Sequence, residues 1–419
     1  MGTREGDIVE ICRRAKAASQ GMLSASTATK NAALEKIAEL LEEEKEYIRS
    51  ENAKDIDNGR RNALSAAMLD RLALTDEVLA SMIAGLREVV ALNDPVGAIG
   101  SMVRRPNNLM VGRMRVPLGV IAMIYESRPN VTIDAAALCL KAGNSVILRG
   151  GSEAIHSNIA LARLIQKSLR RTGLDENGVQ VVGDTDREAV ALLLKQDDYV
   201  DLIIPRGGEG LIRFVTKNST IPVLKHYKGV CHIYVDKEAD LAKATPIILN
   251  SKVQRPGVCN ALEGVLVHAD IAADYLPVIT AALQEEGVRI LGCEKTCSLS
   301  KNVEAARETD WGREFLDLAL IIRVVEGYDE AREYIRRYGS NHTECILTEN
   351  YSRANAFVRQ IDASAVMVNA SSRFNDGAQL GLGTEIGIST TKLHAYGPMG
   401  LEELTTRKFV VFGEGQVRD

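Results

Sequence analysis

The sequence predicts an α/β protein with two Rossmann-like domains and a small additional β element. Two blocks of short apolar runs alternate with stretches of helical periodicity, one from Pro117 to about Lys228 and the other from Gly229 to about Tyr396. Apolar strands separated by helices are typical of βαβ units that build a buried parallel sheet. The length of 419 residues allows two or three domains with a core in each.

The first block is preceded by a helical region and contains its own strands and helices. From Asp7 to about Leu92 apolar residues recur at three-to-four spacing in a charged background, which predicts helices. Strands are expected at 119–126, 145–150, 179–183 and 200–205, and helices at 132–143, 155–173 and 186–196. A dinucleotide-binding architecture is indicated, but the Gly-x-Gly-x-x-Gly fingerprint does not open a strand-turn-helix unit.

The second block follows the same pattern. Strands are expected at 229–236, 263–269, 318–325, 344–349 and 364–371, and helices at 241–250, 275–286, 328–339 and 352–360.

A hairpin and a late strand remain outside these blocks. Pro106 and Asn107 favour a turn within 105–108, and the strand 408–412 needs a sheet to join. We therefore predict three parts. Residues 1–104 and 117–228 form a cofactor domain, 229–396 a catalytic domain, and 105–116 with 397–419 an oligomerisation element.

Composition excludes several classes of function. The net charge of −5 and the lack of a basic cluster argue against nucleic acid or an anionic membrane as a partner. Seven scattered cysteines and no apolar leader predict reduced thiols in the cytoplasm. Cys293 and Cys297 have no second ligand pair, so no metal site is expected.

Cys259, in "QRPGVCNALE", stands out among the cysteines. The Pro-Gly pair before it predicts a turn, and a thiol near a helix N-terminus or beside Arg255 gains thiolate character. The alternative is a buried small apolar residue. His226, His232, His268 and His342 are available as bases, but none lies in a supporting motif.

Several long segments resemble a known family. They are "VPLGVIAMIYESRPNVTIDAAALCLKAGNSVILRGGSEAIHSN", "DLIIPRGGEGLIRFV", "GVCHIYVD", "QRPGVCNALE", "AVMVNASSRFNDGAQLGLGTEIGIST" and "KLHAYGPMGLEELTT". In order from about residue 10 to residue 415, the chain resembles the gamma-glutamyl phosphate reductase family of the aldehyde dehydrogenase superfamily. The resemblance implies an aldehyde dehydrogenase-like fold.

The resemblance also implies the catalytic residues. Cys259 matches the acyl-accepting nucleophile, and Asn130, with the backbone N–H of Cys259, matches the oxyanion donors. A helix N-cap is the alternative interpretation of Asn130. The stretch "LKHYKGVCHIYVD" has no carboxylate before Asp236, where hydrolytic relatives carry a glutamate base, so phosphate or hydride is expected to attack the thioester.

The implied reaction is the NADPH-dependent reduction of L-glutamyl 5-phosphate to L-glutamate 5-semialdehyde, the second step of proline biosynthesis from glutamate. Arg128 and Arg255 are the expected donors to the phosphate and to the substrate carboxylate, in either order, with surface salt bridges as the alternative. Rival functions are a CoA-acylating aldehyde dehydrogenase and a non-catalytic partner of glutamate 5-kinase, the enzyme expected to supply the substrate.

Cofactor contacts are implied at three places in the sequence. Arg149, with Ser152 close by, is expected at the adenosine ribose, where an arginine suits the 2′-phosphate of NADPH. Gly207 and Gly208 are expected to let the backbone approach the pyrophosphate. Glu314, with Asp317 as its rival, is expected at the nicotinamide ribose. The hairpin and the late strand imply a homo-oligomer.

Overall fold

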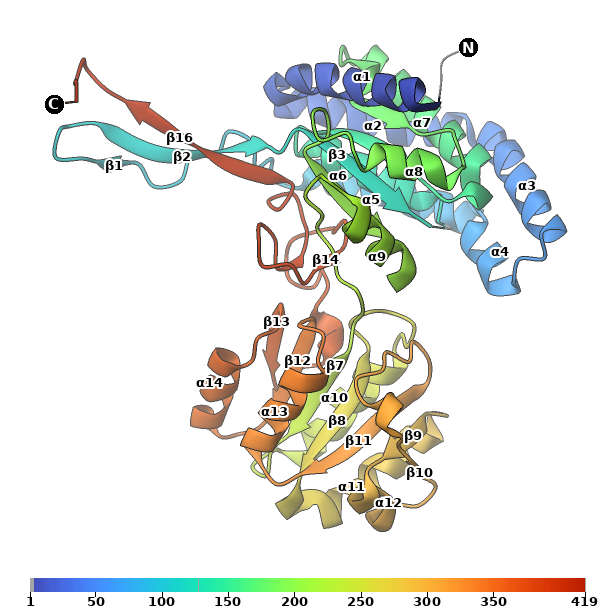
Figure 1. The fold of residues 1–419 in the computed structure, drawn as a ribbon, viewed down its shortest axis with the longest axis vertical. Helices are drawn as coiled ribbons and strands as arrows, with labels where there is room; N and C mark the ends of the chain where they lie inside the picture. Colours follow the sequence, from blue (N-terminus) through green and yellow to red (C-terminus); the bar gives the residue numbers. More distant parts are fainter. Residues whose placement is uncertain (1–3, 127, 419) are drawn as a thin grey trace. The chain divides into compact units, whose positions relative to one another are not determined.

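The computed structural model describes residues 4–126 and 128–418, which form two compact units (Figure 1). The first unit contains 1–225, 382–387 and 399–419, and the second contains 226–381 and 388–398. Each unit is therefore assembled from segments that are far apart in the sequence.

Five helices open the first unit: α1 (Arg4–Ser24), α2 (Thr27–Glu43), α3 (Lys45–Arg61), α4 (Ala66–Leu72) and α5 (Asp76–Ala91). Ser26, Ser65 and Thr75 cap α2, α4 and α5, because each side-chain oxygen accepts a hydrogen bond from a backbone N–H of the first turn. The helical region predicted from 7 to 92 is confirmed. No helix in the described part of the chain has the length and apolar character needed to cross a membrane.

A four-stranded parallel sheet forms the centre of the first unit, in the order β5-β4-β3-β6. Its strands are β3 (Val120–Tyr125), β4 (Ser145–Arg149), β5 (Val179–Val181) and β6 (Leu202–Arg206). The helices that follow them are α6 (Asn130–Lys141), α7 (Ile155–Arg171), α8 (Arg187–Leu193) and α9 (Glu209–Asn218). All four strands predicted in this block are confirmed within a few residues.

An antiparallel ribbon extends from the first unit (Figure 1). It contains β1 (Val103–Arg104), β2 (Met110–Pro117) and β16 (Thr405–Phe412), with β2 in the middle. The register runs from Thr405 opposite Pro117 to Phe412 opposite Met110. The late strand expected at 408–412 thus begins three residues earlier, and β2 is the partner that it needed.

The second unit is built on a seven-stranded parallel sheet in the order β10-β9-β11-β8-β7-β12-β13. Its strands are β7 (Cys231–Val235), β8 (Leu262–His268), β9 (Arg289–Gly292), β10 (Glu304–Ala305), β11 (Ala319–Val325), β12 (Thr343–Leu347) and β13 (Ala365–Val368). Its helices are α10 (Leu241–Val253), α11 (Ala269–Glu285), α12 (Glu294–Leu299), α13 (Tyr328–Tyr338) and α14 (Tyr351–Gln360). A short pair, β14 (Ile388–Ser389) and β15 (Gly397–Pro398), completes it.

Five elements of the second unit were not expected from the sequence: β9, β10, α12, β14 and β15. Each contains only two to six residues, which is too short for a periodic pattern to develop. The five strands that were predicted in this block are all present. The predicted α/β fold with parallel sheets is confirmed.

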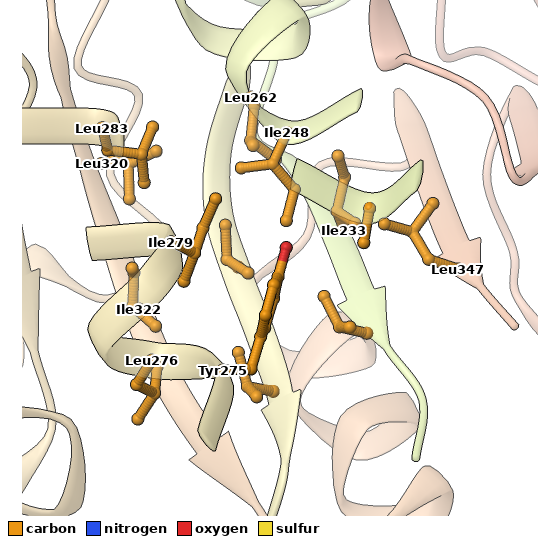
Figure 2. Packing of buried hydrophobic residues seen from close by; sticks show 14 of the residues in the cluster. Ile233, Ile248, Leu262, Tyr275, Leu276, Ile279, Leu283, Leu320, Ile322 and Leu347 are labelled. Atoms are coloured by element: carbon orange, nitrogen blue, oxygen red, sulfur yellow. The ribbon is translucent and has the colours of Figure 1, made fainter. Parts of the chain in front are cut away.

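The seven-stranded sheet buries both faces, as its continuous apolar strands require. Ile233 and Val235 of β7 pack in one core cluster with α10 and α11, whereas Tyr234 between them packs in the other cluster with α13 and α14. Figure 2 shows the first cluster, in which Tyr275 and Ile279 of α11 lie over the sheet. Alternate side chains of one strand therefore fasten helices to opposite faces.

The α11 contact predicts a difference in stability between two adjacent residues. Ile279 is fully buried and Val278 is 55% exposed. Ile279→Ala should lower the free energy of unfolding by about 2–5 kcal/mol, since it leaves a cavity under the helix. Val278→Ala, the matched control, should stay within about 0.5 kcal/mol. Chemical unfolding followed by circular dichroism measures both, and equal midpoints would contradict this packing.

Candidate active site

Cys259 lies in a turn between the end of α10 and the start of β8, and its side chain is half-buried. The turn predicted from the Pro-Gly pair is present. The chain after Cys259 enters β8, where a strand was expected at 263–269, so Cys259 does not begin a helix of its own segment. No helix dipole of this segment therefore acts on the thiol, and other contacts must position it.

Gly229 makes the closest of these contacts. A Cβ added to Gly229 would lie 1.9 Å from the carbonyl oxygen of Cys259, so only glycine allows the two backbones to approach this closely. The thiol of Cys231, two residues further along, donates a hydrogen bond of 3.2 Å to the same carbonyl oxygen. The Cys259 backbone is thus held from one side by the chain entering β7.

Glu314 is joined to this contact. Its Oε1 accepts a hydrogen bond of 2.8 Å from the backbone N–H of Gly229. Glu314, the residue expected at the nicotinamide ribose, therefore bonds to Gly229, and Gly229 contacts the Cys259 backbone within the second unit. Asp317, its rival in the sequence, is exposed and caps the N–H of Leu318 at 2.8 Å.

The segment Ser371–Asn375 holds the turn from another side. Ser372 Oγ donates to the carbonyl oxygen of Asn260 at 2.7 Å, and Asn260 Nδ2 donates to the carbonyl oxygen of Asn375 at 2.9 Å. Ser251 at the end of α10 accepts from the N–H of Ser372 at 3.2 Å. The contact joins residues more than a hundred positions apart in the chain.

Arg373 lies in the middle of this segment. Its Nη1 donates to the side-chain oxygen of Asn260, and its Nε donates to Gln254 Oε1 at 2.7 Å. Arg373 was not predicted from the sequence, although it lies within the segment "NASSRFNDG" of the family resemblance. An arginine between two serines has no distinctive spacing relative to Cys259, so only the fold reveals their proximity.

The carboxylates of Glu263, in β8, and Asp236, after the end of β7, are engaged in other contacts. Glu263, fully buried, pairs with Lys252 at 3.0 Å and accepts from the N–H of Leu316 at 3.3 Å. Burial raises the pKa of Glu263 to about 7, although Lys252 opposes this rise. Asp236, the first carboxylate after "LKHYKGVCHIYV", is buried and accepts from Tyr234 and Thr348. Both carboxylates are thus engaged by other groups of the protein.

Three of the histidines that were considered as bases for Cys259 contact other groups of the protein. His232 bonds to Glu344 at 3.0 Å, and His268 caps α11 by accepting from the N–H of Asp270. His342 is fully buried, with Nδ1 3.8 Å from Cys231 Sγ and 2.8 Å from Thr343 Oγ1. Burial, with a smaller contribution from His226, lowers the pKa of His342 to about 3.

In the first unit, α6 begins at Asn130, whose side-chain amide donates to Asp134 Oδ2 at 3.1 Å. The N-cap position belongs to Pro129, which makes no side-chain cap bond, so the alternative interpretation of Asn130 as a cap is wrong. Burial raises the pKa of Asp134 to about 6. Arg128, which precedes this helix, is exposed.

The end of β4 and the start of α9 contain the residues expected to bind the cofactor. Arg149 is only 9% exposed and donates to the carbonyl oxygens of Gly150 at 2.9 Å and Thr185 at 2.8 Å. Arg149 is therefore not a surface arginine. Its Nη2 group bonds to the backbone of the loop 184–186 and holds that loop in place. Ser152, three residues later, is exposed.

Gly207 and Gly208 lie between β6 and α9. The backbone N–H of Gly208 donates to Glu126 Oε2 at 2.9 Å, and a Cβ on Gly207 would collide with the same carboxylate. An anionic oxygen thus already lies against this glycine turn. The fold brings the end of β3, with Glu126 and Asn130, to the same edge of the sheet as this turn.

The site residues predicted from the sequence are therefore divided between the two units. Asn130, Arg128, Arg149, Ser152, Gly207 and Gly208 belong to the first unit, and Cys259, Arg255 and Glu314 belong to the second. The pairing of Asn130 with Cys259 in an oxyanion hole remains a prediction.

The Gly229 contact predicts a strong effect from a single methyl group. Gly229→Ala should displace the Cys259 carbonyl and destabilise the protein by about 1–3 kcal/mol. It should also reduce kcat for the reduction that the family resemblance implies by roughly a hundredfold. Gly257→Ala is the matched control, because its Cβ would meet only the Leu316 oxygen at 3.6 Å. Steady-state kinetics and thermal unfolding measure both variants. An unimpaired Gly229→Ala enzyme would exclude this contact.

The buried His342 predicts a loss of stability in acid. Its folded pKa of about 3 lies below the ordinary value of 6.5, so the unfolded chain binds more protons and stability falls as the pH drops through 6.5. Between pH 8 and pH 5 this group should cost about 2 kcal/mol. His342→Gln should lose correspondingly less over that range, whereas the control His156→Gln, with an exposed ring, should follow the wild type. Parallel stability–pH curves would contradict the assignment.

Comparison with known proteins shows the family of the chain. Residues 2–289 match the aldehyde dehydrogenase family. The gamma-glutamyl phosphate reductase of Desulfotalea psychrophila is 62% identical over 416 residues, which cover 99% of this chain and 100% of that protein. The gamma-glutamyl phosphate reductase of Desulfatibacillum aliphaticivorans is 59% identical, with 98% of each chain covered.

Solved structures extend the comparison to the fold. The crystal structure of gamma-glutamyl phosphate reductase from Thermotoga maritima has a TM-score of 0.97 and 48% identity, and the match covers 98% of this chain and 100% of that one. An acetylating aldehyde dehydrogenase from Geobacillus thermoglucosidasius, with 18% identity and a TM-score of 0.70, shares the fold alone; 99% of this chain and 98% of that one are covered. The chain therefore belongs to the aldehyde dehydrogenase family and, within it, to the gamma-glutamyl phosphate reductases.

Proposed function

We propose that this chain reduces L-glutamyl 5-phosphate to L-glutamate 5-semialdehyde and phosphate, the second step of proline biosynthesis from glutamate. The reaction is that of the family to which the chain belongs. The observation that carries the proposal for the site is the turn at Cys259, whose backbone is held by Gly229, Cys231 and the segment Ser371–Asn375. A turn fixed so closely presents its thiol in one orientation, as a nucleophile requires.

Cys259 begins the proposed reaction as a thiolate. Its sulfur forms a bond to the acyl carbon of the substrate, and the C–O bond to the phosphate breaks, leaving a thioester on the enzyme. The side-chain amide of Asn130 and the backbone N–H of Cys259 donate to the oxyanion that forms during this step. Asp134 fixes the Asn130 amide and thereby the direction of its N–H groups.

Residues of the first unit suit NADPH, which supplies the hydride that reduces the thioester to the aldehyde. The fit is supported by the glycine turn before α9, where the N–H of Gly208 already holds a carboxylate oxygen. Ser152 is exposed at the start of the segment before α7, and Arg149 has a buried Nε without an acceptor in the described chain. We assign Arg149 and Ser152 to the adenosine ribose, Gly207 and Gly208 to the pyrophosphate, and Glu314 to the nicotinamide ribose.

Arg128 and Arg255 are proposed to bind the two anionic ends of the substrate. Both are exposed, and each is within a few residues of a catalytic position, Asn130 for Arg128 and Cys259 for Arg255. Guanidinium groups match phosphate and carboxylate with two parallel hydrogen bonds.

Two alternative functions are less well supported. A CoA-acylating enzyme shares the missing base, but its solved relatives resemble this chain in fold only, at 18% identity. A non-catalytic partner of glutamate 5-kinase would not need the Cys259 turn held from two sides.

The remaining expectations concern the surroundings of the reaction. We propose a cytoplasmic homo-oligomer, in which the ribbon of β1, β2 and β16 contributes to the subunit contact. On that ribbon Phe409, Val411 and Phe412 are 69%, 54% and 61% exposed, an apolar surface that a partner strand would cover. The predicted division into a cofactor domain, a catalytic domain and an oligomerisation element is part of the same proposal.

The reverse reaction provides the test. Purified protein given pyrroline-5-carboxylate, the cyclised form of the semialdehyde, and NADP should reduce NADP only when phosphate is present, because the thioester needs an acceptor other than water. Cys259→Ala should lower the rate at least about 10⁴-fold, since the covalent route is lost. Absorbance at the wavelength of reduced cofactor measures both.

The matched control is Cys297→Ala, because the thiol of this half-buried residue of α12 bonds, within residues 4–126 and 128–418, to the carbonyl oxygen of Gly292 at 3.6 Å. It should retain wild-type activity. Phosphate-independent reduction would mean that a base activates water, and full activity in Cys259→Ala would remove the thioester mechanism.

A further inference from the structure

Two arginines flank the Cys259 turn, and only one of them was predicted. Arg255 lies within the turn, four residues before Cys259, and is exposed. Arg373 approaches from the segment Ser371–Asn375 and bonds to Asn260, the residue directly after Cys259. The fold therefore brings Arg373 to the residue after Cys259, while Arg255 precedes Cys259 in the same turn, and both belong to one compact unit.

Arg373 is held in place without being neutralised. Its acceptors are the amide oxygens of Gln254 and Asn260, which fix the guanidinium plane but carry no charge. Arg373 is half-buried, so part of its side chain, which carries five N–H donors, remains accessible to solvent. Among residues 4–126 and 128–418, neither Arg373 nor Arg255 forms an ion pair with a carboxylate within 4.0 Å.

The charges around Arg373 favour a bound anion. Burial lowers the pKa of Arg373, and the positive charge of Arg255 lowers it further. Asp376 and the thiols of Cys259 and Cys231 act in the opposite direction. Asp376 is itself used by the backbone N–H groups of Ala378 at 3.1 Å and Gln379 at 3.3 Å. Two neighbouring cations that repel each other are an unfavourable arrangement unless a multiply charged anion joins them.

We propose that Arg373 and Arg255 together bind the phosphoryl group of the substrate beside Cys259, an assignment that rests on the proposed function. The geometry of the substrate supports phosphate over carboxylate. The phosphoryl group is bonded through one oxygen to the carbon that Cys259 attacks, whereas the α-carboxylate lies at the other end of the carbon chain. A dianion also matches two guanidinium groups, while a carboxylate needs only one.

The assignment gives Arg373 a role in the chemical step. When the thiolate forms its bond to the acyl carbon, the phosphate leaves with both electrons of the C–O bond and takes up a proton from water. Negative charge on the departing oxygens increases as that bond breaks, and the two guanidiniums stabilise it. In the reverse direction the same pair holds phosphate while one of its oxygens attacks the thioester and Cys259 leaves as a thiolate.

The phosphate dependence of the reverse reaction tests this assignment. Arg373→Gln keeps a side chain that can bond to its neighbours but removes the charge, and it should raise the KM for phosphate at least about tenfold. Arg255→Gln should act in the same direction. The KM for the semialdehyde should stay within about twofold in both, and Arg373→Lys should give an intermediate KM for phosphate. Arg359→Gln on α14, an exposed arginine that bonds to the carbonyl oxygen of Asn355, should match the wild type.

A second measurement does not depend on turnover. Inorganic phosphate should slow the alkylation of Cys259 by iodoacetamide in the wild type and in Arg359→Gln. It should fail to do so, at the same concentration, in Arg373→Gln. Circular dichroism of each variant verifies that it is folded.

Two results would overturn the assignment. An increased KM for the semialdehyde with an unchanged KM for phosphate would place the α-carboxylate on Arg373. A reduced kcat with both KM values and the phosphate protection unchanged would make Arg373 only a clamp on the turn. A wild-type enzyme that needs no phosphate would instead refute the proposed function itself, so the two failures are distinguishable.

Discussion

The contact between Gly229 and the carbonyl group of Cys259 constrains the second unit more than any other interaction near the thiol. It requires a residue without a side chain before β7, and it brings the start of β7 against the turn that precedes β8. Cys231 and Glu314 then bond on either side of this contact. The order of strands in the sheet, with β7 beside β8, makes the approach possible.

Most of the fold could be predicted because its signals are local. Apolar runs of strand length between helical stretches identified nine strands of the two parallel sheets, and the turn residues Pro106 and Asn107 located the hairpin. The strands β9 and β10 were not predicted because they contain only four and two residues, too few for a periodic pattern. Local reasoning also predicted the turn before Cys259 and the strand that follows it.

The site was less predictable, for a different physical reason. Cys259 and Asn130 were found through resemblance, since neither has a spacing that distinguishes it from a core residue or a cap. Arg373 and Ser372 act on the turn across a separation of more than a hundred residues, which no periodic pattern encodes. The buried pair of Lys252 and Glu263 is similar: each looks like an ordinary surface charge in the sequence, yet both are excluded from solvent.

The pairing of β16 with β2 also determines when the first unit can be completed during synthesis. β2 is translated early, but its partner Thr405–Phe412 follows the whole of the seven-stranded sheet (Figure 1). Asn144, between α6 and β4, donates a hydrogen bond of 2.8 Å to the carbonyl oxygen of Leu404. This bond also cannot form before Leu404 has been synthesised. Until Thr405–Phe412 has been synthesised, the edge of β2 that pairs with β16 stays open, so the nascent chain carries an unpaired strand edge while the seven-stranded sheet is being made.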